Sequence, residues 1–153
     1  MGDETTDYAI FTAASLDRHG GGWAAILARQ GRHRIMQGTA AASLDGLELL
    51  AMLVGLAAVP PAAAVCLITR NDRLYRGLTV ERERWRAAGW RRAGGQPLGH
   101  GGLWQRLDTA FRERTVSFSH ERDLCGPSPL GRVHGLARAA TGRGSRRAGP
   151  GPG

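Results

Sequence analysis

Hydrophobic and polar residues alternate along the first part of the chain, and this pattern predicts β-strands. Three such runs are rich in strand-forming residues: Tyr8–Ser15, Trp23–Arg29 and Arg32–Gly38. Asp17–Gly22 predicts a turn, because it ends in three consecutive glycines, and Gly31 predicts a tight turn between the second and third strands. In the first strand, side chains are expected to alternate between Ile10 and Thr12 on one face and Phe11 and Ala13 on the other.

After the third strand the apolar spacing becomes helical. Ser43 is a suitable N-cap for a helix that continues to about Ala58, with Asp45 in its first turn, and Pro60 ends it. The wholly apolar run Ala64–Thr69 is typical of a central strand that is covered on both faces.

The rest of the chain completes an α/β pattern. It predicts a short helix from Asn71 or Asp72 to Gly77, a helix that starts at Thr79, a glycine-rich loop over Arg91–Gly102, a helix over Leu103–Arg114, a strand over Thr115–Glu121 and a helix over Leu130–Ala140. We therefore expect one α/β domain with a five-stranded mixed sheet over residues 8–140. Residues 1–7 and the basic, Gly/Pro-rich residues 141–153 are expected to be disordered tails.

The net charge is +8. The chain has 21 arginines and no lysine. This charge favours a polyanionic partner, nucleic acid first. No apolar run is long enough for a membrane span, and the acidic start MGDETTD argues against a secretory signal, so we expect a cytoplasmic protein. The two cysteines have no metal-ligand spacing.

Several segments together resemble ribonuclease H of the bacterial single-domain type. They are IFTAAS in the first strand, GGWAAILARQGR in the hairpin, LELLAMLVGLAAV in the first helix, LITRNDRLYRGL around the fourth strand, and LGRVHGLARAA in the last helix. Trp85, Gly89 and Trp90, followed by Pro97 and by Leu103-Trp104, resemble that family's basic handle and the helix after it. The resemblance covers nearly all of Tyr8–Ala140 and implies a ribonuclease H-like fold.

The resemblance also implies a chemistry, which is cleavage of the RNA strand of an RNA–DNA hybrid. Family enzymes hold two Mg²⁺ or Mn²⁺ ions with four carboxylates, since hard cations take oxygen ligands. At the four matching positions this sequence has Ala13, Glu48, Arg70 and His134. One carboxylate of four is retained, so we predict that the metal site and the hydrolytic activity are lost.

Arg70 is expected to replace a missing cation and to pair with Glu48, because an unpaired buried carboxylate is costly. Asp72, two residues further on, is interpreted as a helix cap rather than as a substitute metal ligand.

The handle predicts a nucleic-acid interface. Its arginines, together with Arg70, are the predicted phosphate contacts: Arg82, Arg84, Arg86, Arg91 and Arg92. The resulting hypothesis is a monomeric ribonuclease H-like pseudoenzyme that binds RNA–DNA hybrid or another duplex and uses no cofactor. Two alternatives stay open, namely residual metal-dependent hybrid cleavage and a scaffold whose basic surface meets an acidic protein.

Overall fold

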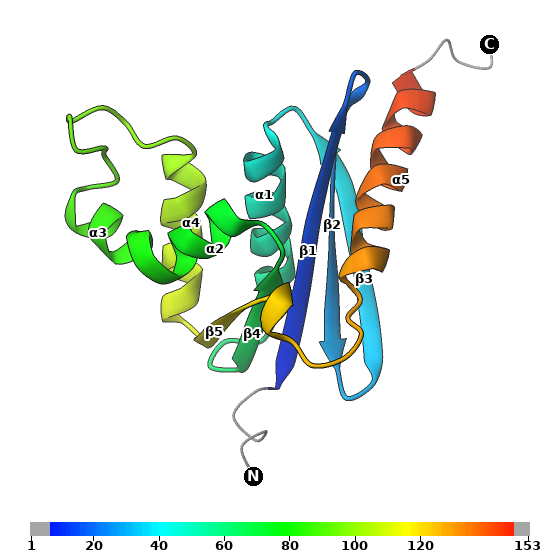
Figure 1. Ribbon diagram of the computed structural model, residues 1–153, viewed down its shortest axis with the longest axis horizontal. Coiled ribbons are helices and arrows are strands. Elements are labelled where there is room, and N and C mark those ends of the chain that lie inside the picture. The colour runs from blue at the N-terminus through cyan, green and yellow to red at the C-terminus, as the bar shows by residue number, and fades with distance from the viewer. Residues whose placement is uncertain (1–6, 149–153) are drawn as a thin grey trace.

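The computed structural model describes the backbone of residues 7–148 and the side chains of residues 7–141. Its centre is a five-stranded sheet in the order β3-β2-β1-β4-β5 (Figure 1). The strands are β1 (Tyr8–Asp17), β2 (Gly20–Arg29), β3 (Arg32–Ala40), β4 (Ala64–Thr69) and β5 (Thr115–His120). β1, β2 and β3 are antiparallel neighbours, whereas β4 lies parallel to both β1 and β5. The predicted mixed five-stranded sheet flanked by helices is confirmed.

Helices cover both faces of this sheet. They are α1 (Leu44–Ala57), α2 (Asp72–Arg76), η2 (Gly77–Glu81), α3 (Arg82–Ala87), α4 (Gly101–Arg112), the short η3 (Glu121–Asp123) and α5 (Leu130–Ala148). α1 packs on one face, with α4 and the α2–α3 run beside it, while α5 packs on β1 and β2 from the other face (Figure 1).

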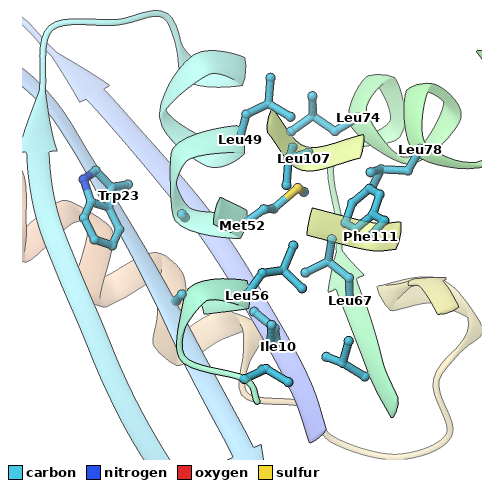
Figure 2. Close-up of a cluster of buried hydrophobic side chains, with 14 of the residues drawn as sticks. Ile10, Trp23, Leu49, Met52, Leu56, Leu67, Leu74, Leu78, Leu107 and Phe111 are labelled. Atoms are coloured by element: carbon cyan, nitrogen blue, oxygen red, sulfur yellow. The ribbon is translucent and has the colours of Figure 1, made fainter. Parts of the chain in front are cut away.

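The larger apolar cluster lies between the sheet and α1 and α4 (Figure 2). Its members include Ile10, Trp23, Met52, Leu56, Leu67, Leu107 and Phe111. The smaller cluster lies between the sheet and α5 and includes Phe11, Ala13, Ile26, Ile68, Val133 and Ala137. Ile10 and Phe11 thus belong to opposite faces, as the alternation in the first strand predicted.

The turn between the first two strands is shorter than predicted. β1 continues to Asp17 and β2 begins at Gly20, so the glycines at 21 and 22 belong to the strand. A Cβ atom on Gly22 would lie 2.3 Å from the carbonyl oxygen of Ala137 in α5. The glycine run therefore serves close packing of a strand against helices, and only Gly20 of the three has a positive φ.

The two predicted helices after β4 form one continuous helical run, because α2, η2 and α3 follow one another without a break. Gly77 does not end a helix. A Cβ atom there would lie 2.6 Å from the Trp104 ring, so Gly77 lets this run approach α4.

Other boundaries moved by a few residues. β3 extends to Ala40, α4 begins at Gly101 and ends at Arg112, and β5 ends at His120.

The last helix is longer than predicted. α5 continues to Ala148, so residues 141–148, which were expected to be a disordered tail, are helical in the structure. Thr141 is buried and donates hydrogen bonds to the carbonyl oxygens of Ser15 and Ala137, which fixes the chain beyond Ala140. The remaining tail predictions, for residues 1–6 and 149–153, lie outside the described residues. Among the described helices, none has the length and apolar character needed to cross a membrane.

Candidate functional site

Glu48 is buried where α1 crosses two central strands. Its side chain accepts two hydrogen bonds on Oε2, from the hydroxyl of Thr12 in β1 at 2.8 Å and from that of Thr69 in β4 at 2.6 Å. The residue is 4% exposed. Glu48 therefore connects three elements through one oxygen atom.

Burial raises the pKa of the Glu48 carboxyl, because the charged form loses hydration. The hydroxyls of Thr69 and Thr12 act in the opposite direction, since they stabilise the carboxylate, but burial prevails. The environment of Glu48 thus favours an uncharged acid, whereas a cation ligand has to be ionised.

The predicted pair between Arg70 and Glu48 is wrong. The Arg70 guanidinium instead contacts Glu121 just beyond β5, with Nη2 3.3 Å from Oε2. Thr69, the last residue of β4, meets Glu48, whereas Arg70 follows the strand and its guanidinium lies beside Glu121. The hydroxyl groups of Thr12 and Thr69 bind the Glu48 carboxyl group, where the guanidinium of Arg70 was expected.

The other two family positions lie toward α5. Ala13 is fully buried in the cluster that includes Val133 and Ala137. His134 is half-buried on α5, and its Nε2 atom has no hydrogen-bond partner among the described residues. Burial and, after it, the positive charges of Arg70 and Arg138 lower the pKa of His134, so the imidazole is neutral near pH 7.

These four residues do not fit a pair of divalent cations. A methyl group and a guanidinium stand at two of the positions, and the carboxylate that remains is buried and bound by hydroxyl groups. Mg²⁺ and Mn²⁺ need several oxygen ligands, usually carboxylates, around one point. Within residues 7–141, no group of three or more His, Cys, Asp or Glu side chains could hold a metal ion.

Asp72 does not cap its helix. Asn71 is the N-cap of α2, and its side chain accepts a hydrogen bond from the Leu74 amide. Asp72 lies beside the end of β5, where its Oδ1 atom is 2.8 Å from His120 Nε2 and 3.0 Å from Arg122 Nη1. Its exposed carboxylate therefore lies beside two basic side chains.

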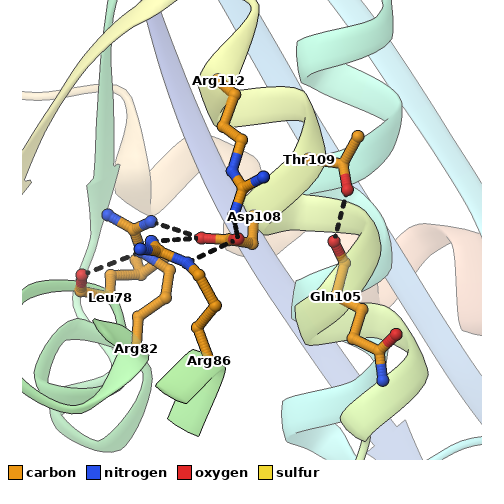
Figure 3. Close-up of polar contacts among 7 residues, drawn as sticks. All are labelled: Leu78, Arg82, Arg86, Gln105, Asp108, Thr109 and Arg112. Atoms are coloured by element: carbon orange, nitrogen blue, oxygen red, sulfur yellow. Dashed lines mark hydrogen bonds and ion pairs between the residues drawn. The ribbon is translucent and has the colours of Figure 1, made fainter. Parts of the chain in front are cut away.

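Two of the predicted phosphate contacts are paired with a buried carboxylate of the neighbouring helix. Arg82 and Arg86 bind Asp108 of α4 at 2.7–2.9 Å, and Arg112 reaches the same carboxylate at 3.3 Å (Figure 3). The Asp108 side chain is 4% exposed. The Arg82 guanidinium also lies over the Phe111 ring, 4.9 Å from its centroid. Arg82 and Arg86 thus fasten α3 to α4.

Burial by itself would raise the pKa of the Asp108 carboxyl. Hydrogen bonds from Arg86 and Arg82, together with their charges, outweigh that effect and hold the pKa below its usual range. Asp108 is therefore ionised under all near-neutral conditions.

The other handle arginines point outward. Arg84, Arg91 and Arg92 line a hollow of about 460 Å³ whose apolar wall includes Trp85 and Leu98. Arg84 also pairs with Glu81 at 2.9 Å, and Arg91 donates to the carbonyl oxygen of Gly95. These three side chains are the handle residues whose positions suit contact with a ligand.

Thr12, Thr69, Glu121 and Asp108 were not found by sequence reasoning. The two threonines carried a signal, since each directly precedes a family acid position. Asp108 carried another, because it lies on the apolar face of its helix between Trp104 and Phe111. Glu121 carried none, since its partner comes from a distant part of the chain.

Comparison with known proteins shows the family of this chain. Residues 5–122 match the family model for RNase H. The chain belongs to the ribonuclease H family. Curated ribonucleases H similar to it include one from Nitrosococcus oceani, 30% identical over 128 residues, covering 83% of this chain and 87% of that protein. Another, from Nitrobacter hamburgensis, is 35% identical over 133 residues, covering 84% of this chain and 87% of that protein.

Solved structures show the same fold. A foamy viral protease-reverse transcriptase in complex with RNA/DNA hybrid superposes with a TM-score of 0.76 at 16% identity, over 90% of this chain and 20% of that chain. LC9-RNase H1, a type 1 RNase H with the type 2 active-site motif, superposes with a TM-score of 0.73 at 20% identity. The match covers 91% of this chain and 74% of that chain.

Proposed function

We propose that this chain is a ribonuclease H homologue that binds RNA–DNA hybrid, or another nucleic-acid duplex, without cleaving it. The proposal is supported by the residues that stand at the family's four metal-binding positions. Ala13 and Arg70 supply no oxygen ligand, His134 stands at a third position, and Glu48 is buried among hydroxyl groups. Without several carboxylates at one point, the chain lacks the means to hold two hard cations.

Retained binding is supported by the intact fold and by the basic handle. Structural neighbours of this chain bind RNA/DNA hybrid, among them the foamy viral enzyme and LC11-RNase H1. Hybrid is recognised largely through its shape and its sugar–phosphate backbone, and these contacts do not depend on catalytic cations. Arg84, Arg91 and Arg92 are the proposed handle contacts, whereas Arg82 and Arg86 act through the fold.

The test uses one labelled RNA–DNA hybrid in two readouts. The hybrid is incubated with excess protein and Mg²⁺ or Mn²⁺, and binding is followed by mobility shift while RNA length is followed on a denaturing gel. We expect a shifted complex that contains intact RNA. Absence of any complex at low salt would refute the binding, and RNA fragments that disappear with Glu48→Gln would refute the loss of cleavage.

A further inference from the structure

Arg70 stands at one of the four altered metal positions and is partly open to solvent. Its side chain is 42% exposed, and its contact with Glu121 uses the Nη2 atom at 3.3 Å. Glu121 is itself shared, because Oε2 also accepts a hydrogen bond from the Ser128 hydroxyl at 3.2 Å. The guanidinium is therefore held in place by one long contact and still reaches solvent.

Helix α5 adds two basic groups to this place. His134 and Arg138 project from one side of the helix, four residues apart. The buried Nε2 atom of His134 has no hydrogen-bond partner among the described residues, and the charges of Arg70, Arg138 and Glu121 each act on this imidazole. Arg70 and Arg138 carry two positive charges and Glu121 carries one negative charge, so the group has an excess of positive charge.

This positive charge is opposite in sign to the carboxylate charge that holds the cations of a metal-dependent site. A cluster of carboxylates repels a phosphate group unless cations lie between them, whereas a guanidinium binds a phosphate directly through two parallel N–H bonds. Glu48 does not offset the positive charge on this side, because it is buried on the other face of the sheet with both threonines.

We propose that Arg70, supported by His134 and Arg138, forms a phosphate-binding site that contacts a backbone phosphate of the bound duplex without a metal ion. The inference rests on the proposed binding of hybrid and adds its mechanism at this point. A duplex held in this way requires no divalent cation, and its affinity depends on Arg70 through both charge and geometry.

The experiment measures hybrid affinity by fluorescence anisotropy over a series of salt concentrations, with EDTA or with Mg²⁺ at equal ionic strength. Wild-type protein should bind equally well in both buffers. Arg70→Ala should weaken binding about tenfold at low salt and reduce the salt slope by about one phosphate contact. Arg70→Lys should lie between the two, because it retains the charge without the planar pair of donors.

Arg106→Ala is the matched control, since it removes an exposed arginine from α4, on the opposite face of the sheet from α5. Its affinity should stay within about twofold of wild type. The inference is overturned if Arg70→Ala binds like Arg106→Ala, or if wild-type binding requires Mg²⁺. If wild-type protein binds no hybrid, the proposed function fails, and the phosphate site is then tested separately by titration with inorganic phosphate. A phosphate-dependent NMR shift of the Arg70 Nε–H group supports the site, and an unchanged signal refutes it.

Discussion

The carboxyl group of Glu48 is held by two hydroxyl groups from neighbouring parallel strands. This arrangement satisfies a buried acid without a counter-charge, so Glu48 acts as a polar connection between α1, β1 and β4. Removal of its charge should therefore affect the stability of the fold in a direction that depends on pH.

Glu48→Gln should stabilise the protein at neutral pH. Because burial raises the pKa of Glu48 in the folded state, the folded protein holds this proton more tightly than the unfolded chain does. The resulting stability is complete below the unfolded pKa of 4.5 and is lost as pH rises through the folded pKa. At pH 7 the melting temperature of the variant should exceed that of wild type, by about 2–4 °C for each kcal/mol gained in the free energy of unfolding. The difference should vanish below pH 4.5. A difference that grows toward low pH would contradict the assignment.

A double-mutant cycle should separate the partners of Glu48. Thr69→Val removes the 2.6 Å hydrogen bond while keeping the side-chain shape, and its coupling with Glu48→Gln should be about 1–2 kcal/mol at pH 7. The same cycle with Arg70→Ala should give less than about 0.5 kcal/mol, because Arg70 faces Glu121. Equal coupling in the two cycles, measured by chemical denaturation, would show that the contacts are misassigned.

The four proposed site positions were assigned from the sequence by the motifs that flank them along the strands and helices. Their contacts could not be assigned in this way. The Arg70–Glu48 pair was inferred from charge, but in the structure Arg70 contacts Glu121 and Glu48 accepts hydrogen bonds from Thr12 and Thr69. Glu121, the actual partner, is brought there by the parallel pairing of β4 with β5, which local sequence does not specify.

At the scale of elements, α5 is fitted to the sheet by backbone contact as much as by apolar side chains. Gly22 of β2 lies against the helix, and a Cβ atom there would be 2.4 Å from the Thr141 hydroxyl. Gly22→Ala should destabilise the fold by about 1–3 kcal/mol. Gly135→Ala on α5 is the matched control and should stabilise by about 0.5–1 kcal/mol, since its Cβ meets no atom closer than 3.9 Å. Equal effects in denaturant titrations would show that α5 does not pack as described.

The handle is fastened to α4 by Asp108. Asp108→Asn should destabilise the protein by about 2 kcal/mol at pH 7, less than for a fully enclosed ion pair, because Arg86 and Arg112 reach solvent. The folded pKa of Asp108 is lowered, so its stabilisation exists above the unfolded pKa of 3.8 and is lost as pH falls through the folded pKa. Asp123→Asn, at an exposed position in η3, is the control and should change the melting temperature little at pH 7. A pH-independent loss for Asp108→Asn would contradict a charge-based anchor.

Most elements could be predicted because hydrophobic periodicity and caps are local. Ala64–Thr69 and the Ser43 cap agree with the sequence pattern residue by residue. Glycine caused the main errors. At Gly22 and Gly77 it was interpreted as a turn or a helix end, whereas each lets distant elements approach, and nothing within the local sequence distinguishes those roles.

At the scale of the whole molecule, the structure combines the ribonuclease H fold with an excess of arginine. Arg82 and Arg86 stabilise the handle through Asp108, while Arg84, Arg91 and Arg92 face outward. Charge reversal should distinguish the two groups. Arg91→Glu combined with Arg92→Glu should weaken hybrid binding at least tenfold with little change in melting temperature. Arg82→Glu should mainly lower the melting temperature, and the opposite pattern would refute this division.

The central claim is that the fold has been kept without its metal-dependent chemistry. The most direct test is a cleavage assay on a labelled RNA–DNA hybrid with Mn²⁺, comparing wild-type protein with a variant that combines Ala13→Asp, Arg70→Asp and His134→Asp. Together with Glu48, that variant has carboxylates at all four family positions. We expect no cleavage by wild-type protein and measurable, EDTA-sensitive cleavage by the variant. Cleavage by wild-type protein that is abolished by Glu48→Gln would contradict the claim.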